Sequence, residues 1–376
     1  MRALFLTFIA LLAALPAWSR AEAAPGQLQQ ALEHLVAQQV APAITVVAVR
    51  HGELLFEASA GLADPQSGRR MTGRTPLRQA SVTKPYVATT VIQLAAEKNI
   101  PLATPIKSLL PRSFLDPLVE AGYEPAGITL DHLLTHTSGL RDHTNSWRYM
   151  AISFLLRWQA WTALEQVELL PHLGPPLWPP GENYAYSDTG YVLLGQIVEQ
   201  LSGRSLAAAV REYARFDDIG LQATWWELAE TTPDSLEPMA RQYMDGWEVS
   251  NLHPTIDLFG GGGLIATTLD AALFLDALFS KAQPGGLVLR DPVLLARFLG
   301  EGDDPVTGSY KRGIAKGSMN GTTVYVHSGF WGTAVYHFPE LEVTIAGAVT
   351  DRNGIPALRQ AIATAAAIEI DAGRED

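Results

Sequence analysis

The chain has 376 residues, of which 47% are hydrophobic, and it carries a formal net charge of −12 without a single cysteine. This charge argues against a nucleic acid or an anionic membrane as partner, because the 27 Lys and Arg residues form no basic patch. The lack of cysteine excludes disulfides and a thiol nucleophile, so a large apolar core must stabilise the chain. A small-molecule or peptide substrate remains.

The first residues have the pattern of a secretory signal peptide. Arg2 precedes an apolar run from Ala3 to Trp18 that is too short to span a bilayer comfortably. Ala21-Glu22-Ala23 forms a cleavage site of small residues, so we expect removal of residues 1–23 and a secreted or periplasmic protein. An uncleaved membrane anchor is the alternative, which the helix-breaking Pro16 disfavours.

Strand patterns gather at the two ends of the chain, and the middle is mainly helical. A helical segment, two strands joined at His51-Gly52, three later strands and a last helix are expected at 28–39, 43–50, 53–60, 322–329, 333–339, 341–350 and from about 355. We therefore predict an α/β fold with an antiparallel sheet built from both chain ends, flanked by helices, and an inserted helical domain. The α/β lobe should cover about 24–80 and 285–376, and the helical lobe about 81–284.

The stretch "SVTKPYVATTVIQLAAEKN" begins at Ser81 and predicts a helix whose first turn holds Pro85. Residues three apart share a helix face, so the Lys84 amine can reach the Ser81 hydroxyl. The positive end of the helix dipole disfavours a protonated amine, which favours Lys84 as a base for a serine nucleophile. In the alternative, Ser81 only caps the helix and Lys84 is a solvated charge.

The segment from Ile128 to Leu140 predicts a short helix that Thr129 caps and Gly139 ends. His132 and His136 lie one turn apart within it, a spacing that suits zinc. The glutamate of an H-E-x-x-H pattern is missing and no third ligand is evident, so the sequence favours no metal and no cofactor.

Three further motifs follow in the chain. Tyr186, Ser187 and Asp188 stand just ahead of a helix that ends near Gly203, and the simplest role of Asp188 is to cap it. The glycine run 260–263 lacks the lysine of a phosphate-binding loop, which favours close backbone packing. The segment "HSG" at 327–329 ends a predicted strand, where glycine permits close approach of a substrate.

Taken in order, S-x-x-K, Y-S-D and H-S-G resemble the motifs of the serine beta-lactamase-related family. This family spans class C beta-lactamases, D-alanyl-D-alanine carboxypeptidases, D-amino-acid peptidases and family VIII esterases. "LLTHTSGL", "YSDTGYVLLG" and "GGLIATTLDAA" extend the resemblance over most of the mature chain. The resemblance implies the beta-lactamase/transpeptidase-like fold, which agrees with the layout expected above.

The resemblance also implies roles for individual residues. Ser81 would be the acylated nucleophile, Lys84 its proton acceptor and Tyr186 the group that passes a proton to the leaving group. The backbone amides of Ser81 and Phe330 would form the oxyanion hole, with Gly329 beside it, and His327 would lie near the leaving-group or carboxylate side.

Two positions depart from the pattern of beta-lactamases. Asp188 stands where Asn is common, and an ionised carboxylate cannot donate a hydrogen bond to a substrate carbonyl. His327 stands where Lys of K-T-G is typical. Both differences argue against efficient beta-lactam hydrolysis.

The sequence therefore predicts an exported serine hydrolase that acts by acyl transfer on a D-amino-acid or D-Ala-D-Ala type peptide, or on an ester. A true beta-lactamase and a non-catalytic binding protein that retains the fold are the alternatives. The oligomeric state does not follow from the sequence.

Overall fold

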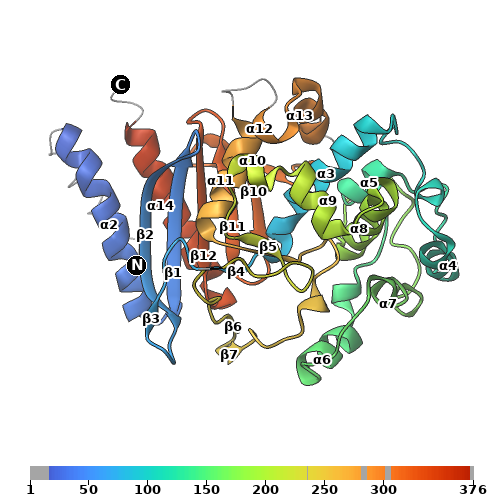
Figure 1. Cartoon of the computed structure of the whole chain (residues 1–376), viewed down its shortest axis with the longest axis horizontal. Coiled ribbons are helices and arrows are strands. Elements are labelled where there is room, and N and C mark those ends of the chain that lie inside the picture. The colour runs from blue at the N-terminus through green and yellow to red at the C-terminus, as the bar shows by residue number, and fades with distance from the viewer. Residues whose placement is uncertain (1–16, 235, 281–285, 301–305, 373–376) are drawn as a thin grey trace.

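The computed structural model describes residues 17–234, 236–280, 286–300 and 306–372. A large sheet lies at one end of the molecule with helices on both faces, and a mainly helical region fills the other end (Figure 1). Most of the predicted signal peptide, residues 1–16, lies outside the described residues. The predicted cleavage site after Ala23 falls within helix α2 (Ala17–Ala37). Within the described part of the chain, no helix combines the length and hydropathy that a bilayer crossing requires.

The large sheet is built from both ends of the chain, as the sequence predicts. Its seven strands are antiparallel in the order β3-β2-β1-β12-β11-β10-β9. The N-terminal and C-terminal strands meet where Ile44 pairs with Val349. The strands are β1 (Ala43–Arg50), β2 (Glu53–Asp64), β3 (Arg69–Arg70), β9 (Ala315–Met319), β10 (Thr322–Gly329), β11 (Thr333–Phe338) and β12 (Val343–Val349).

Strand β1 is buried on both faces because helices cover the sheet on either side. Val46 and Ala48 pack in one apolar cluster with α2 and α14 (Ile355–Ala372), and Val47 and Val49 pack in another that includes helix α11 (Thr268–Phe279). Side chains alternate between the faces of a strand, which explains this division. The run "AITVVAVR" is accordingly apolar almost throughout, as a strand buried on both faces must be.

The remaining elements form the helical region and its link to the sheet. Two small sheets, β4-β8-β5 and β6-β7, lie between the parts. Their strands are β4 (Leu77–Arg78), β5 (Thr224–Trp226), β6 (Tyr243–Met244), β7 (Trp247–Glu248) and β8 (Leu264–Ala266). The other α-helices are α3 (Lys84–Glu97), α4 (Arg112–Glu120), α5 (Leu130–Leu134), α6 (Trp147–Leu155), α7 (Ala163–Val167), α8 (Asp188–Ser202), α9 (Leu206–Tyr213), α10 (Phe216–Ile219), α12 (Gly286–Leu289) and α13 (Pro292–Leu299). The 3-10 turns are η1 (Ala80–Thr83), η2 (Ile106–Ser108), η3 (His143–Asn145), η4 (Leu170–His172), η5 (Pro254–Ile256) and η6 (Arg352–Gly354).

Helices α3, α5 and α8 pack together and bring the sequence motifs toward one another. Pro85 lies in the first turn of α3, and Thr129 caps α5, as expected. Helix α5 ends at Leu134 rather than at Gly139, because Thr135 and His136 leave the helical path. The predicted boundaries of the two lobes stay a prediction, and α11 packs against β1, β11 and β12 although it precedes residue 285.

Candidate active site

Strand β4 places the serine motif at a fixed point. It pairs with β8, and the Gln79 side chain donates to the backbone oxygens of Leu77 and Ala266. The chain then turns sharply at Ala80, which has a φ of +45°, an uncommon conformation for a residue with a Cβ atom. Ser81 follows in η1 and stays half-buried. A local backbone strain of this kind is typical of functional sites.

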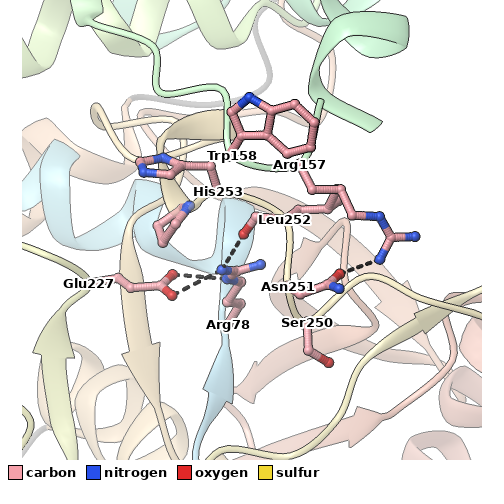
Figure 2. Close-up of a pocket in the computed structure, with 9 residues that line it drawn as sticks. Arg78, Arg157, Trp158, Glu227, Ser250, Asn251, Leu252 and His253 are labelled. Atoms are coloured by element: carbon pink, nitrogen blue, oxygen red, sulfur yellow. Dashed lines mark hydrogen bonds and ion pairs between the residues drawn. The ribbon is translucent and has the colours of Figure 1, made fainter. Parts of the chain in front are cut away.

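A pocket of about 500 Å³ lies beside this strand and includes neither Ser81 nor Lys84 (Figure 2). The buried Arg78 guanidinium makes two hydrogen bonds to the Glu227 carboxylate, at 2.9 and 3.0 Å, and another to the Leu252 backbone oxygen. Arg157 reaches Asn251 across the opening. Because Arg78 is engaged by protein groups, its role here is to join β4 to the loops that follow β5 and β7.

Lys84 is fully buried and makes three contacts through its Nζ atom. The nitrogen lies 3.0 Å from the Ser81 hydroxyl and 2.7 Å from the Gly261 backbone oxygen, and it forms a short ion pair with Asp188. The carboxylate and the carbonyl can only accept hydrogen bonds. When Lys84 is a neutral amine, its two protons therefore face these acceptors and its lone pair faces Ser81. The geometry suits the removal of a proton from the serine.

Asp188 is the first residue of α8, and Ser187 occupies the capping position ahead of it. The Ser187 hydroxyl accepts from the backbone amide of Gly190. The simple interpretation of Asp188 as the helix cap is therefore wrong, because its carboxylate turns instead toward Lys84. The location at a helix N-terminus favours a carboxylate, since unpaired backbone amides lie there.

Tyr186 lies against both groups. Its hydroxyl shares a hydrogen bond with Ser81, and Lys84 Nζ lies 5.0 Å from the centre of its ring. Burial, together with the nearby charge of Asp188, raises the pKa of Tyr186 well above its ordinary value. The phenol therefore stays protonated at neutral pH, and a resting tyrosinate is not supported.

His327 lies on β10 and is engaged through both ring nitrogens. Nδ1 is 3.1 Å from the Ser328 backbone oxygen, and Nε2 is 3.1 Å from the Tyr310 hydroxyl. Because a carbonyl oxygen only accepts, Nδ1 carries the proton and Nε2 accepts from Tyr310. Burial, with the Lys84 charge, lowers the pKa of His327 to about 3. This histidine is therefore neutral, unlike the lysine of beta-lactamases.

The end of β10 brings Phe330 close to the serine turn. Gly329 packs on the backbone of Gln79, where an added Cβ would lie 2.2 Å from the carbonyl oxygen. The Thr333 hydroxyl also donates to that oxygen, at 2.9 Å. Strand β10 and η1 are thus held together, which brings the backbones of residues 81 and 330 into the same region.

Three residues near the site were not singled out from the sequence. Gly261 supplies the carbonyl that binds Lys84, Tyr310 binds His327, and Asp142 accepts from the backbone amide of Asp188. The glycine run marked close packing, but no pattern shows which carbonyl faces a side chain. Asp142 and Tyr310 lie in loops outside the motifs, and only the fold brings them to the site.

The two histidines of the 128–140 segment serve the backbone instead of sharing a ligand. His132 Nδ1 accepts from the Thr129 amide at 3.2 Å, and His136 Nδ1 accepts from the Ser187 amide at 3.2 Å. Among the residues that the structure describes, no group of three or more His, Cys, Asp or Glu has the arrangement of a metal site.

A sheet from both chain ends, a helical insert and a serine–lysine–tyrosine cluster define the class of serine beta-lactamases and penicillin-binding proteins. The family model described as Beta-lactamase matches residues 28–369. The chain belongs to this family, which confirms both the predicted fold and the relationship recognised in the motifs.

Named relatives include enzymes and penicillin-binding proteins. Esterase EstB of Burkholderia gladioli is 38% identical over 173 residues, which are 45% of this chain and 43% of that protein. Penicillin-binding protein 4* of Bacillus subtilis (strain 168) is 28% identical over 260 residues, 64% of this chain and 54% of that protein. The matched segments thus span about half the length of these curated relatives.

The fold is also shared with a solved structure over nearly its whole length. The D-stereospecific amidohydrolase from Streptomyces sp. is 26% identical, with a TM-score of 0.72. The match covers 88% of this chain and 97% of that chain. Together with the family match, this structure confirms the predicted relationship to the serine beta-lactamases.

Proposed function

We propose that this protein hydrolyses esters or amides without a carboxylate beside the scissile bond, through an acyl-enzyme on Ser81. The observation that carries the proposal is the set of contacts around Lys84 Nζ. Two of its three partners only accept hydrogen bonds, so the neutral amine has its lone pair directed at the Ser81 hydroxyl.

In the proposed reaction, Lys84 takes the hydroxyl proton while Ser81 Oγ bonds to the substrate carbonyl carbon. The backbone amides of Ser81 and Phe330 stabilise the resulting oxyanion. The protonated Tyr186 phenol gives its proton to the leaving oxygen or nitrogen as that bond breaks, and it regains a proton from the Lys84 ammonium. Water then attacks the acyl carbon and gives a proton to Lys84. The bond between that carbon and Ser81 Oγ breaks, and Lys84 returns the proton to Oγ as the acid leaves.

The substrate class follows from the charges at the site. His327 is neutral and bound to Tyr310, so it offers no positive charge to a substrate carboxylate. The Asp188 carboxylate adds negative charge beside Lys84, the residue that contacts Ser81. Both features disfavour D-Ala-D-Ala peptides and beta-lactams, which carry a carboxylate. The names of the esterase and amidohydrolase relatives support neutral esters and D-amino-acid amides.

A turnover screen tests this function. Short nitrophenyl esters and D-amino-acid amides should be hydrolysed, D-Ala-D-Ala peptides and nitrocefin should react slowly or not at all, and Ser81→Ala should be inactive. A fluorophosphonate probe should label the peptide that contains Ser81 and no other. Labelling at another residue, or turnover by Ser81→Ala, would contradict the nucleophile. The absence of turnover and labelling would favour the non-catalytic binding protein, and fast nitrocefin turnover would favour the beta-lactamase.

We also propose that the protein is exported, because its first 23 residues have the pattern of a signal peptide. Expression in a bacterial host with the full chain should yield a protein that begins at Ala24, as measured by intact mass. A mature protein that retains Arg2 to Ala23 in the cytoplasmic fraction would contradict export. A small molecule or small peptide is the expected partner.

A further inference from the structure

His136 holds the backbone on both sides of Tyr186. Its carbonyl oxygen accepts from the Ala185 amide at 2.9 Å, and its Nδ1 atom accepts from the Ser187 amide at 3.2 Å. The residue has a φ of +56°, a left-handed conformation that aims the carbonyl and the imidazole at the same extended segment. One residue thus fixes the position and the rotation of residue 186 in the chain.

The imidazole ring also supports the Tyr186 side chain. The two ring centres lie 4.2 Å apart with an angle of 33° between the planes. The rings of Tyr191 and Tyr310 lie 5.1 and 4.8 Å from the same imidazole, and the His136 side chain is buried. The tyrosine that shares a hydrogen bond with Ser81 therefore rests on His136 through both its backbone and its ring.

The protonation state of His136 agrees with a role as acceptor. Burial, and then the charge of Lys84, lowers the pKa of His136 well below the ordinary value, so the ring stays neutral. Since Nδ1 accepts from the Ser187 amide, the proton sits on Nε2. The Nε2 atom finds no acceptor within the described residues. The contact that the imidazole makes through a hydrogen bond is therefore the one at Nδ1.

We propose that His136 is a positioning residue for Tyr186, which it holds at hydrogen-bond distance from Ser81 by accepting the Ser187 amide at Nδ1. The inference rests on the proposed function, because it assigns Tyr186 to the proton transfer. His136 touches neither the substrate nor Ser81 in this role and acts only through the tyrosine.

Two kinds of substitution separate the acceptor from the ring. In His136→Asn the side-chain oxygen can take the place of Nδ1, and asparagine tolerates a positive φ. In His136→Phe a ring remains but the acceptor is lost. Should His136→Phe fail to fold, His136→Gly removes the acceptor at a φ that glycine adopts freely. His132→Ala, in helix α5 just ahead of His136, is the matched control because its side chain bonds the backbone at the start of that helix.

The expected result is a loss of kcat in ester turnover of about 10²-fold for His136→Phe, the scale of a misplacement near 1 Å, with little change in KM. His136→Asn should keep kcat within about 3-fold of the wild type, and His132→Ala should keep it while its Tm falls. In a Tyr186→Phe background, His136→Phe should cause no further loss, because the group that it positions is already absent.

Several outcomes would overturn the inference. One is a wild-type kcat for a folded His136→Phe or His136→Gly variant. Another is a kcat of His136→Asn as low as that of His136→Phe. A third is a loss of kcat from His136→Phe that is as large in the Tyr186→Phe background as in the wild type. Nitrogen NMR gives a check apart from activity, since His136 should show a protonated Nε2 and a bare Nδ1 from pH 5 to 9. A full kcat for Tyr186→Phe itself would instead refute the proposed proton transfer, and the inference with it.

Discussion

The carboxylate of Asp142 accepts a hydrogen bond from the backbone amide of Asp188. One acidic residue therefore anchors the start of α8, and the other extends from that start to Lys84. Burial, and then the charge of Asp188, raise the pKa of Asp142 to about 7, compared with an ordinary value of 3.8. The charge of Asp188 thus acts on the neighbouring carboxyl group of Asp142.

This pair predicts an unusual dependence of stability on pH. Between about 3.8 and 7 the folded protein binds the Asp142 proton more tightly than the unfolded chain does, so this group favours folding less as pH rises. Asp142→Asn removes the cost of ionising the buried group. Its free energy of unfolding relative to wild type should therefore rise from pH 5 to pH 8, by about 1 kcal/mol or more.

Denaturant unfolding at both pH values measures this difference, and Asp116→Asn on the exposed surface of α4 is the matched control. For the control, the free energy of unfolding relative to wild type should not change between pH 5 and pH 8. A difference between Asp142→Asn and wild type that stays constant from pH 5 to pH 8 would contradict the raised pKa of Asp142.

Asp188→Asn should extend activity to lower pH. The carboxylate favours the ammonium form of Lys84, and an amide does not, so the neutral base should persist in more acidic solution. The acidic limb of the kcat/KM profile should therefore move to lower pH, and acylation by beta-lactams should rise. Profiles from pH 4 to 9 measure the shift, and an unchanged limb would show that Asp188 does not act on the base.

Lys84→Ala and Tyr186→Phe should each lower kcat by at least about 10²-fold, the usual scale for the loss of a positioned proton-transfer group. The double variant should lose far less than the product of the two, because both residues serve one proton path. Steady-state kinetics on one ester decides the matter. A single variant with near-wild-type kcat would remove that residue from the mechanism.

Gly329→Ala should lower both activity and stability. The new methyl group would lie 2.2 Å from the Gln79 carbonyl oxygen, so the end of β10 and the serine turn would have to separate. Gly317→Ala in the neighbouring strand β9 is the control, since its methyl group would meet only Val324, at 3.8 Å. Tm and kcat should fall for the first variant and stay near wild type for the second. Equal behaviour would show that the close contact does not matter.

His327→Lys should change substrate preference toward acids. A lysine ammonium can form a charge-assisted hydrogen bond with a carboxylate, which a neutral imidazole cannot. The ratio of kcat/KM for a D-phenylalanyl peptide acid over its amide should rise by about 10-fold or more, from a bond of about 1.5–3 kcal/mol. Lys316→Gln on the neighbouring strand β9 is the control, because it changes a charge away from position 327. An unchanged ratio would contradict the assignment of position 327.

The sheet was predictable because its strands carry a clear signal. The run Ala43–Arg50 is apolar over its buried length except at Thr45, and the His51-Gly52 turn marks the hairpin, so pattern alone located both strands. The end of α5 was harder to predict, since Thr135 and His136 differ little from helical residues in propensity. There the packing against the 185–187 segment decides the conformation.

The sequence also pointed to Ser81, Lys84 and Tyr186, because short motifs keep their residues at fixed spacing. It did not reveal the direction of the Asp188 side chain, since a helix start suits a cap and a buried ion pair equally well. Asp142 and Tyr310 were out of reach for another reason: each meets the site only through contacts between distant parts of the chain.

The pairing of Ile44 with Val349 affects the order in which the molecule assembles. Strand β12 leaves the ribosome about 300 residues after β1, which takes roughly 15–60 s at ordinary rates of synthesis. During that time the N-terminal hairpin has an open edge made of "AITVVAVR", a segment with high strand propensity and a single charge. Until its last strand arrives, Ala43–Arg50 is therefore an edge open to pairing with other chains.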